Sequence, residues 1–175
     1  PAGQFDRRRI GDIGRVGAVE SLLRSGNFSP SAAFSASQGG IVRTASRIWL
    51  EGIDFDLTYF PLKHLGYKCI VGTVGEIYAS LARPESASVR IGVSANLDFP
   101  QIGELWSGMT AALKEHGITR VDLDLCPSRN GLTVSVSIVG ITDGGVEAAR
   151  KPARSKDLVC ISGSVGAAYL GMALL

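Results

Sequence analysis

The chain has 175 residues, of which 45% are hydrophobic and 19% charged, and its formal net charge is +2. A chain of this length buries about 70% of its unfolded surface, which suffices for one domain, or for one domain and the start of another. The near balance of charge implies neither a polyanion-binding surface nor an acidic tail, so nucleic acid is not indicated as a partner.

Three cysteines, Cys69, Cys126 and Cys160, are too few and too scattered for a disulfide framework or a zinc site. Each lies in an apolar segment, so we expect buried free thiols in a reducing compartment. No run approaches 18 apolar residues, and the N-terminus lacks the hydrophobic region of a signal peptide. We therefore expect a cytoplasmic protein that does not associate with a membrane.

The first half of the chain is predicted to contain, in order, a short helix over 13–26, a loop over 25–40, a strand over 41–50 and a long helix over 61–82. Arg83-Pro84 stops the long helix, because a residue before proline disfavours the helical conformation. Gly66, Gly72 and Gly75 each cost that helix about 1 kcal/mol relative to alanine. Close packing against another backbone would explain them.

The second half is predicted to contain a strand over 88–97, a helix over 100–116, and strands over 120–126 and 132–139. Asn130-Gly131 favours a tight turn, so the last two strands are expected to form a hairpin. A polar linker over 143–156 then leads to a short strand over 157–162 and a further helix. These elements predict an α+β fold, with a mixed, mostly antiparallel sheet and helices on one face.

Three segments resemble a known family: EGIDFDL at 51–57, PLKHLGYK at 61–68 and EIYA at 76–79. They are similar to the thiamine-monophosphate kinases of the aminoimidazole ribonucleotide synthetase superfamily. The resemblance implies an N-terminal domain over 1–156, followed over 157–175 by the first strand and helix of a truncated or missing C-terminal domain. It also implies a homodimer in which two such sheets pair into a closed barrel.

The resemblance further implies where magnesium and ATP would bind. In the kinases a Gly-Asp-Asp-Ala-Ala signature holds magnesium, and the equivalent residues 29–33 here are Ser-Pro-Ser-Ala-Ala. Arg47 stands where the family has another metal-binding aspartate. Asp124 keeps its family carboxylate, and Glu76 keeps one that is longer by a methylene, so these two are the implied metal ligands. Magnesium prefers charged oxygen ligands, and a guanidinium repels it.

Two further candidate sites, for substrate and for cofactor, are implied by the same resemblance. Asp54 lies in a turn that the family uses near the thiamine phosphate, which makes it a candidate substrate-binding residue. Alternatively, Phe55, Tyr59 and Phe60 of this turn are core residues and its acids are solvated. Gly163 and Gly166 turn a predicted strand into a helix N-terminus, which is a general anion-binding arrangement and the candidate cofactor-binding site for ATP. No catalytic residue is assigned.

Two hypotheses about function follow. In the first, the protein is a thiamine-monophosphate-kinase-like relative that has lost ATP- and magnesium-dependent phosphoryl transfer and acts by dimerisation or by binding a ligand or partner. In the second, it is an active ATP-dependent kinase that converts thiamine phosphate to thiamine diphosphate. A small phosphorylated ligand is a candidate under both hypotheses, and a different phosphorylated substrate would place the chain in another branch of the superfamily. Phosphoryl transfer depends on charge neutralisation by metal, and the lost carboxylates favour the first hypothesis.

Overall fold

The computed structural model describes residues 33–35, 40–142 and 153–174. The chain divides into two compact units, Pro1–Ala33 and Phe34–Leu175, and nearly all the described residues belong to the second. The helix predicted over 13–26 lies outside the described residues, as does most of the linker predicted over 143–156.

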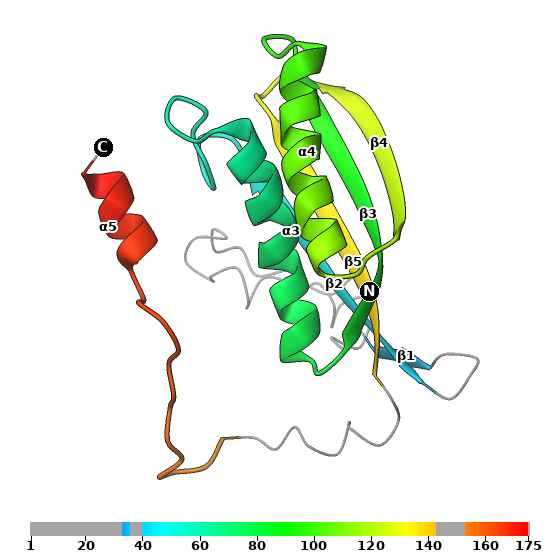
Figure 1. The fold of residues 1–175 in the computed structure, drawn as a ribbon, viewed down its shortest axis with the longest axis vertical. Coiled ribbons are helices and arrows are strands. Elements are labelled where there is room, and N and C mark those ends of the chain that lie inside the picture. The colour runs from blue at the N-terminus through cyan, green and yellow to red at the C-terminus, as the bar shows by residue number, and fades with distance from the viewer. Residues whose placement is uncertain (1–32, 36–39, 143–152, 175) are drawn as a thin grey trace, which may run out of the picture. The chain divides into compact units, whose positions relative to one another are not determined.

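A mixed sheet forms one layer of the domain, in the spatial order β1-β2-β5-β3-β4 (Figure 1). Strand β5 pairs antiparallel with both β2 and β3, and β4 pairs parallel with β3. The bounds of the five strands among the described residues are β1 Ala33–Ser35, β2 Ile41–Leu50, β3 Arg83–Ser94, β4 Arg120–Ser128 and β5 Thr133–Thr142. The predicted α+β fold with a mixed, mostly antiparallel sheet is confirmed, and β1 adds a short strand inside the stretch predicted as a loop.

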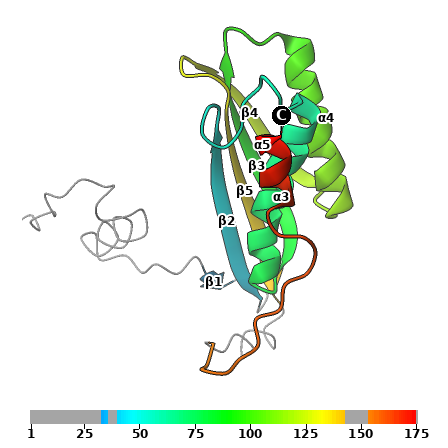
Figure 2. The same ribbon diagram turned by 90° about the vertical axis from the view of Figure 1, so that its left-hand side faces the viewer.

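Two long helices form the second layer, and both cover the same face of the sheet (Figure 2). They are α3, Leu62–Ala79, and α4, Phe99–Glu115. Asp98 begins α4 with a capping box, in which its carboxylate accepts the Gln101 backbone N–H and the Gln101 side chain accepts the Asp98 N–H. The helix predicted over 61–82 ends earlier than expected, because the chain turns out of α3 at Leu81, whose φ is +59°.

The alternation of β5 shows how the sequence sets the two faces of the sheet. Val134, Val136 and Ile138 are fully buried under the helices. Ser135 and Ser137 point to the opposite face. None of the helices among the described residues covers that face (Figure 2). Because side chains in a strand alternate with a period of two, one sequence pattern supplies both the core and the open face.

The contact between α3 and α4 depends on two glycines. A Cβ atom on Gly66 would collide with the Leu105 carbonyl oxygen of α4, and one on Gly108 would collide with the Lys63 carbonyl oxygen of α3. Gly72 likewise leaves room for the Trp49 ring, whereas a Cβ on Gly75 would meet nothing within 4 Å. The close backbone approach expected from the sequence is therefore confirmed at Gly66 and has no counterpart at Gly75.

Two predictions about local pairing were wrong. The Asn130-Gly131 turn forms, with Gly131 at φ +81°, but β4 and β5 are not a hairpin because β3 lies between them. Residues 157–162 do not form the predicted strand. A strand needs a hydrogen-bonded partner, and no described residue pairs with this segment.

A short helix, α5, Ala167–Ala173, follows that segment. Within the part of the chain that the structure describes, no helix combines the length and apolar character needed to cross a membrane.

Candidate functional site

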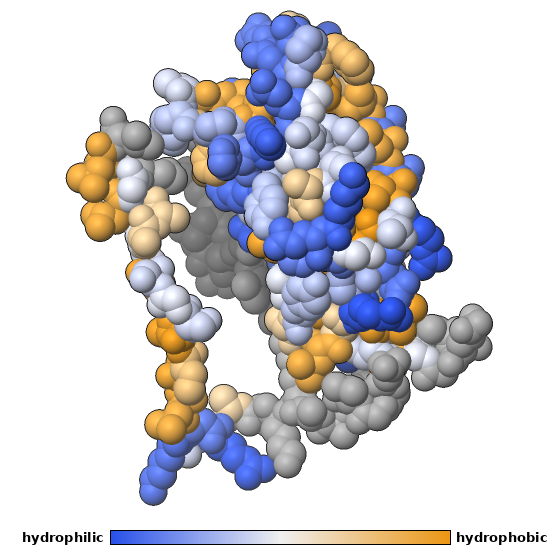
Figure 3. Space-filling model, in the orientation of Figure 1, coloured by the Kyte–Doolittle hydropathy of each residue, from blue (hydrophilic) through white to orange (hydrophobic). Residues whose placement is uncertain are grey.

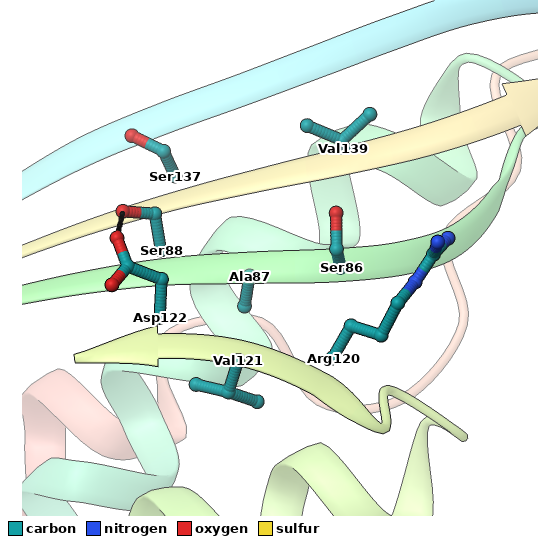
Figure 4. A pocket seen from close by; sticks show the side chains of 8 residues that line it. All are labelled: Ser86, Ala87, Ser88, Arg120, Val121, Asp122, Ser137 and Val139. Carbon is teal, nitrogen blue, oxygen red and sulfur yellow. Dashed lines mark hydrogen bonds between the residues drawn. The ribbon is translucent and has the colours of Figure 1, made fainter.

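The open face of the sheet carries a shallow pocket of about 350 Å³ where β3, β4 and β5 lie side by side (Figure 4). Ser88, Asp122 and Ser137 point toward it from three different strands, and Arg120 borders it. The pocket surface is mostly apolar, with Ala87, Val121 and Val139 among its lining residues, and the small polar side chains come from the outward positions of alternating strands. Sequence reasoning found the alternation but did not bring these three strands together.

One arginine dominates the charge on this face. The Arg90 Nη2 atom lies 2.5 Å from Asp122 Oδ2, and its Nε lies 4.0 Å from Asp124 Oδ2. Ser88 Oγ donates a further hydrogen bond of 3.3 Å to Asp122. The Arg90 hydrogen bond lowers the pKa of the Asp122 carboxyl and Asp122 raises the pKa of Arg90, so the ion pair is maintained at neutral pH.

Asp124, a predicted metal ligand, therefore has a cation beside it. Its side chain is exposed on β4, and its Oδ1 accepts the Leu125 backbone N–H at 2.9 Å. The alternation of apolar and polar residues in β4 predicted that Asp124 is exposed. Its neighbour Arg90 could not be inferred from the sequence, because the parallel register of β3 and β4 places Arg90 opposite Asp124.

Glu76, the other predicted metal ligand, is exposed on α3. Helix α3 covers one face of the sheet (Figure 2). Asp124 lies beside Arg90 on the other face, so one chain does not bring these two carboxylates together. Among residues 33–35, 40–142 and 153–174, no group of three or more His, Cys, Asp or Glu side chains could hold a metal ion. The described residues of a single chain thus do not fit a magnesium site, and metal binding by Asp124 or Glu76 stays a prediction.

Asp54, the predicted substrate-binding residue, stabilises its own turn. Its Oδ2 accepts the Leu50 backbone N–H at 2.9 Å, and its backbone carbonyl accepts a hydrogen bond of 2.9 Å from Lys68 Nζ. Of the aromatic residues in this turn, Phe55 is buried, Phe60 packs partly against the core and Tyr59 is exposed. Substrate binding by Asp54 stays a prediction.

Gly163 and Gly166, the predicted cofactor-binding residues, both have positive φ angles, of 79° and 90°. Gly166 is the N-cap of α5. The sequence therefore identified a turn that needs glycine, because φ angles in this region strain other residues. Whether this turn binds a phosphate also stays a prediction.

A second group of polar residues, which sequence reasoning did not identify as a site, surrounds the Trp49 ring. The Arg47 guanidinium carbon lies 4.2 Å from the ring centroid, and Lys68 Nζ lies 5.4 Å from it. Lys68 Nζ also lies 4.8 Å from the Phe60 ring. Arg47 and Trp49 are two residues apart on β2 and share a face of the strand, which is a signal that the sequence does contain.

The three cysteines differ in burial, so the expectation of three buried thiols was wrong. Cys69 is buried in α3, whereas Cys126 and Cys160 are exposed. Cys126 lies on β4, the edge strand of the described sheet, and Cys160 lies in the segment that pairs with no described strand. An apolar sequence neighbourhood does not bury a residue unless another layer covers it.

We expect Cys69 to be inert toward thiol reagents. Burial raises its pKa from an ordinary 9.0 to about 12. Because only the thiolate reacts, a shift of this size lowers the reactivity of Cys69 at pH 8 roughly a thousandfold. Titration with a chromogenic disulfide at pH 8 should therefore modify two thiols quickly in the folded protein and three in denaturant. Three fast thiols in the folded protein would contradict the burial of Cys69.

The same pKa shift has a consequence for stability. The pKa of this thiol is higher in the folded state than in the unfolded state. Its contribution to the free energy of unfolding is therefore fully present below the unfolded-state pKa of about 9, and it is lost as pH rises toward about 12. The free energy of unfolding should therefore fall over this interval, and Cys69→Ala should remove the part of the fall that Cys69 causes.

The fold and the open sheet face define an α+β domain of the kind that begins aminoimidazole ribonucleotide (AIR) synthetase-like proteins. Residues 36–142 match the family described as AIR synthase related protein, N-terminal domain. Because the match covers more than half of the chain, the protein belongs to this family. Among individual proteins, it is similar to thiamine-monophosphate kinases and to a carbamoyl dehydratase.

Thiamine-monophosphate kinase from Bacillus subtilis (strain 168) is 23% identical over 145 residues, which are 83% of this chain and 45% of the relative. Carbamoyl dehydratase HypE from Rhizobium leguminosarum bv. viciae is 26% identical over 148 residues, or 82% of this chain and 40% of the relative. The solved structure of AaThiL complexed with AMPPCP and TMP superposes with a TM-score of 0.71 at 17% identity, covering 80% of this chain and 45% of that one. The chain thus spans less than half the length of these relatives.

Proposed function

We propose that the protein is a thiamine-monophosphate-kinase-like relative that has lost ATP- and magnesium-dependent phosphoryl transfer and acts as a dimeric, ligand-binding protein. The observation that carries the proposal is the placement of two arginines. Arg90 contacts Asp124, and Arg47 occupies the position where the resemblance implies a metal-binding carboxylate. Phosphoryl transfer relies on metal ions to neutralise the developing charge, and a cation at the metal position opposes that.

The alternative is an active ATP-dependent kinase that forms thiamine diphosphate, with magnesium held at Asp124 and Glu76 and ATP phosphates at Gly163 and Gly166. AaThiL, which shares the fold, was solved with AMPPCP and TMP. The separation of Asp124 from Glu76 on opposite sides of one sheet argues against this arrangement within one chain. The alternative therefore needs ligands from a second chain or from residues outside the described ranges.

We also propose a homodimer in which the open sheet faces of two copies turn toward each other. Ser46 and Ser137 lie opposite each other on β2 and β5 and are joined by a hydrogen bond of 2.8 Å. The side chains at the centre of the open face are therefore small, and the surface there is flat. Strand β4 is the edge strand of the described sheet, and its apolar residues Val121, Leu123 and Leu125, which alternate with the open-face residues, are 38%, 41% and 46% exposed. Figure 3 shows apolar side chains along this edge. Exposed edges and apolar patches of this kind favour association.

The loss of the metal site can be tested directly. We expect Mn²⁺, monitored by electron paramagnetic resonance as a substitute for Mg²⁺, to show no binding to the 175-residue chain tighter than about 1 mM. Incubation with Mg²⁺, ATP and thiamine monophosphate should yield no thiamine diphosphate by chromatography. The Bacillus subtilis kinase is the positive control for both assays.

Two outcomes would contradict the proposal. One is Mn²⁺ binding that Asp124→Asn removes while Asp157→Asn, at an exposed site on another segment, leaves it intact. The other is turnover that depends on Mg²⁺. Arg90→Ala should strengthen Mn²⁺ binding at Asp122 and Asp124 if the guanidinium is what excludes the ion, because it removes the neighbouring positive charge.

A further inference from the structure

We propose that the two copies of the homodimer face each other with their β4 strands running in opposite directions, so that Arg120 of one copy binds the partner's Asp124. The inference rests on the homodimer proposed above, and it names the charged residues that select a second copy and fix its orientation. These residues lie on β3 and β4, at the open face of the sheet.

One end of this surface is positive. Arg83 Nη2 lies 2.8 Å from Glu85 Oε1, and Arg120 Nη2 lies 3.3 Å from Glu85 Oε2, so two guanidinium groups share one carboxylate. The formal charge of this group is therefore +1. Arg120 borders the pocket on the open face, and its side chain is 71% exposed (Figure 4). A guanidinium has five N–H donors, so Arg120 can bind a second acceptor.

The other end is negative, because Asp122 and Asp124 share the single cation Arg90. Arg90 and Ser88 both donate to Asp122, which is thereby satisfied. Asp124 Oδ2 lies only within 4.0 Å of Arg90 Nε, and its side chain is 69% exposed. The formal charge of this group is −1, and Asp124 is the carboxylate that can accept a further donor.

The two ends do not neutralise each other within one copy. Arg120 and Asp124 lie on the same face of β4 and are four residues apart, which is about 13 Å at the usual rise per residue of a strand. This separation exceeds the Debye length of about 8 Å at physiological salt, so the attraction between the two ends is largely screened. The open face along β4 is thus a dipole whose charges sum to zero.

A dipole of this kind fits a reversed copy of itself. A twofold dimer presents the same surface from both copies, so the surface must complement itself. If the twofold axis lies between the sheets and crosses β4 near Asp122, it places β4 over the β4 strand of the partner in the opposite direction. The positive end of each copy then faces the negative end of the other.

The alternative axis, parallel to the strands, leaves these charges without partners. With the two open faces overlapped, it sets β4 over the far side of the partner's sheet, where β2 presents Ser46 and Ile48. Arg120 and Asp124 would then be covered by uncharged side chains, and covering a charge without a partner is costly. Charge complementarity therefore favours the reversed arrangement.

The test is sedimentation equilibrium of the full 175-residue chain at low salt. We expect Arg120→Glu and Asp124→Arg each to weaken self-association at least tenfold, because each sets like charges against each other. An equimolar mixture of the two variants should form a heterodimer, since every facing pair is then opposite in sign. Lys114→Glu and Glu104→Arg are matched controls, exposed on α4 in the other layer, and should change nothing. Circular dichroism of each variant checks that the fold is retained.

The milder variants Arg120→Gln and Asp124→Asn should weaken association less than the reversals do. Self-association that the reversals leave unchanged, or a mixture that forms no heterodimer, would overturn the inference. So would tighter association of Arg120→Glu alone, because it would show that like ends face each other. None of these results removes the homodimer itself, which is tested by the mass of the wild-type chain. A monomeric wild-type chain would overturn both proposals.

Discussion

Gly66→Ala should destabilise the domain by about 3 kcal/mol or more, the upper range for adding a methyl group to a packed interface. The added Cβ would meet the Leu105 carbonyl and the Met109 N–H of α4, which are backbone atoms that no rotamer change can move. The two helices must therefore separate, and their shared core opens. A domain whose total stability is about 5–15 kcal/mol would lose much of it. Chemical denaturation followed by circular dichroism measures the loss.

Gly108→Ala should have a similar effect, because its Cβ would meet the Lys63 carbonyl across the same contact. Gly75→Ala is the matched control, in the same helix as Gly66 but with nothing within 4 Å of the new methyl. It should stabilise the protein by about 0.5–1 kcal/mol, since alanine is the better helix former. Equal effects at Gly66 and Gly75 would show that helix propensity, and not helix packing, determines the cost.

Ser137→Trp should convert the proposed dimer to a monomer without unfolding the domain. Ser137 faces the open side of the sheet at its centre, opposite Ser46, so a large ring there points into solvent in a single copy. In a barrel closed by two such sheets, side chains of both open faces fill the interior, and an indole at its centre would prevent closure. Light scattering coupled to size-exclusion chromatography measures the mass.

Ser107→Trp is the control for this substitution, because Ser107 is exposed on α4, on the layer away from the open sheet face. It should leave the mass of the dimer unchanged. A wild-type chain that is monomeric at about 100 μM, or a Ser137→Trp variant that stays dimeric, would contradict the pairing of open faces.

Much of the fold could be predicted from periodicity because each element faces only one covering layer. Strand β2 was predicted with its observed bounds, and α4 was predicted within one residue at each end. Their patterns are local, so neighbours along the sequence determine which side chains turn inward. The absence of a covering layer is not local, which is why exposed Cys126 and Cys160 were expected to be buried.

The pairing of strands could not be predicted in the same way. Asn130-Gly131 specifies a tight turn, but the turn alone does not determine whether the flanking strands hydrogen-bond to each other or to a third strand. The insertion of β3 between β4 and β5 also places Arg90 beside Asp122 and Asp124. A register between distant segments creates this cluster of charges, so the sequence could supply its members but not their contacts.

The position of β5 has a consequence for how the domain forms. It is the last of the five described strands in the chain, yet it lies between β2 and β3, and it pairs Thr142 with Ile41. Neither β2 nor β3 can complete its ladder until β5 has left the ribosome. Such long-range pairing delays folding. Until then the edges of β2 and β3 that will pair with β5 stay unpaired in the nascent chain, and they are suitable binding sites for a chaperone.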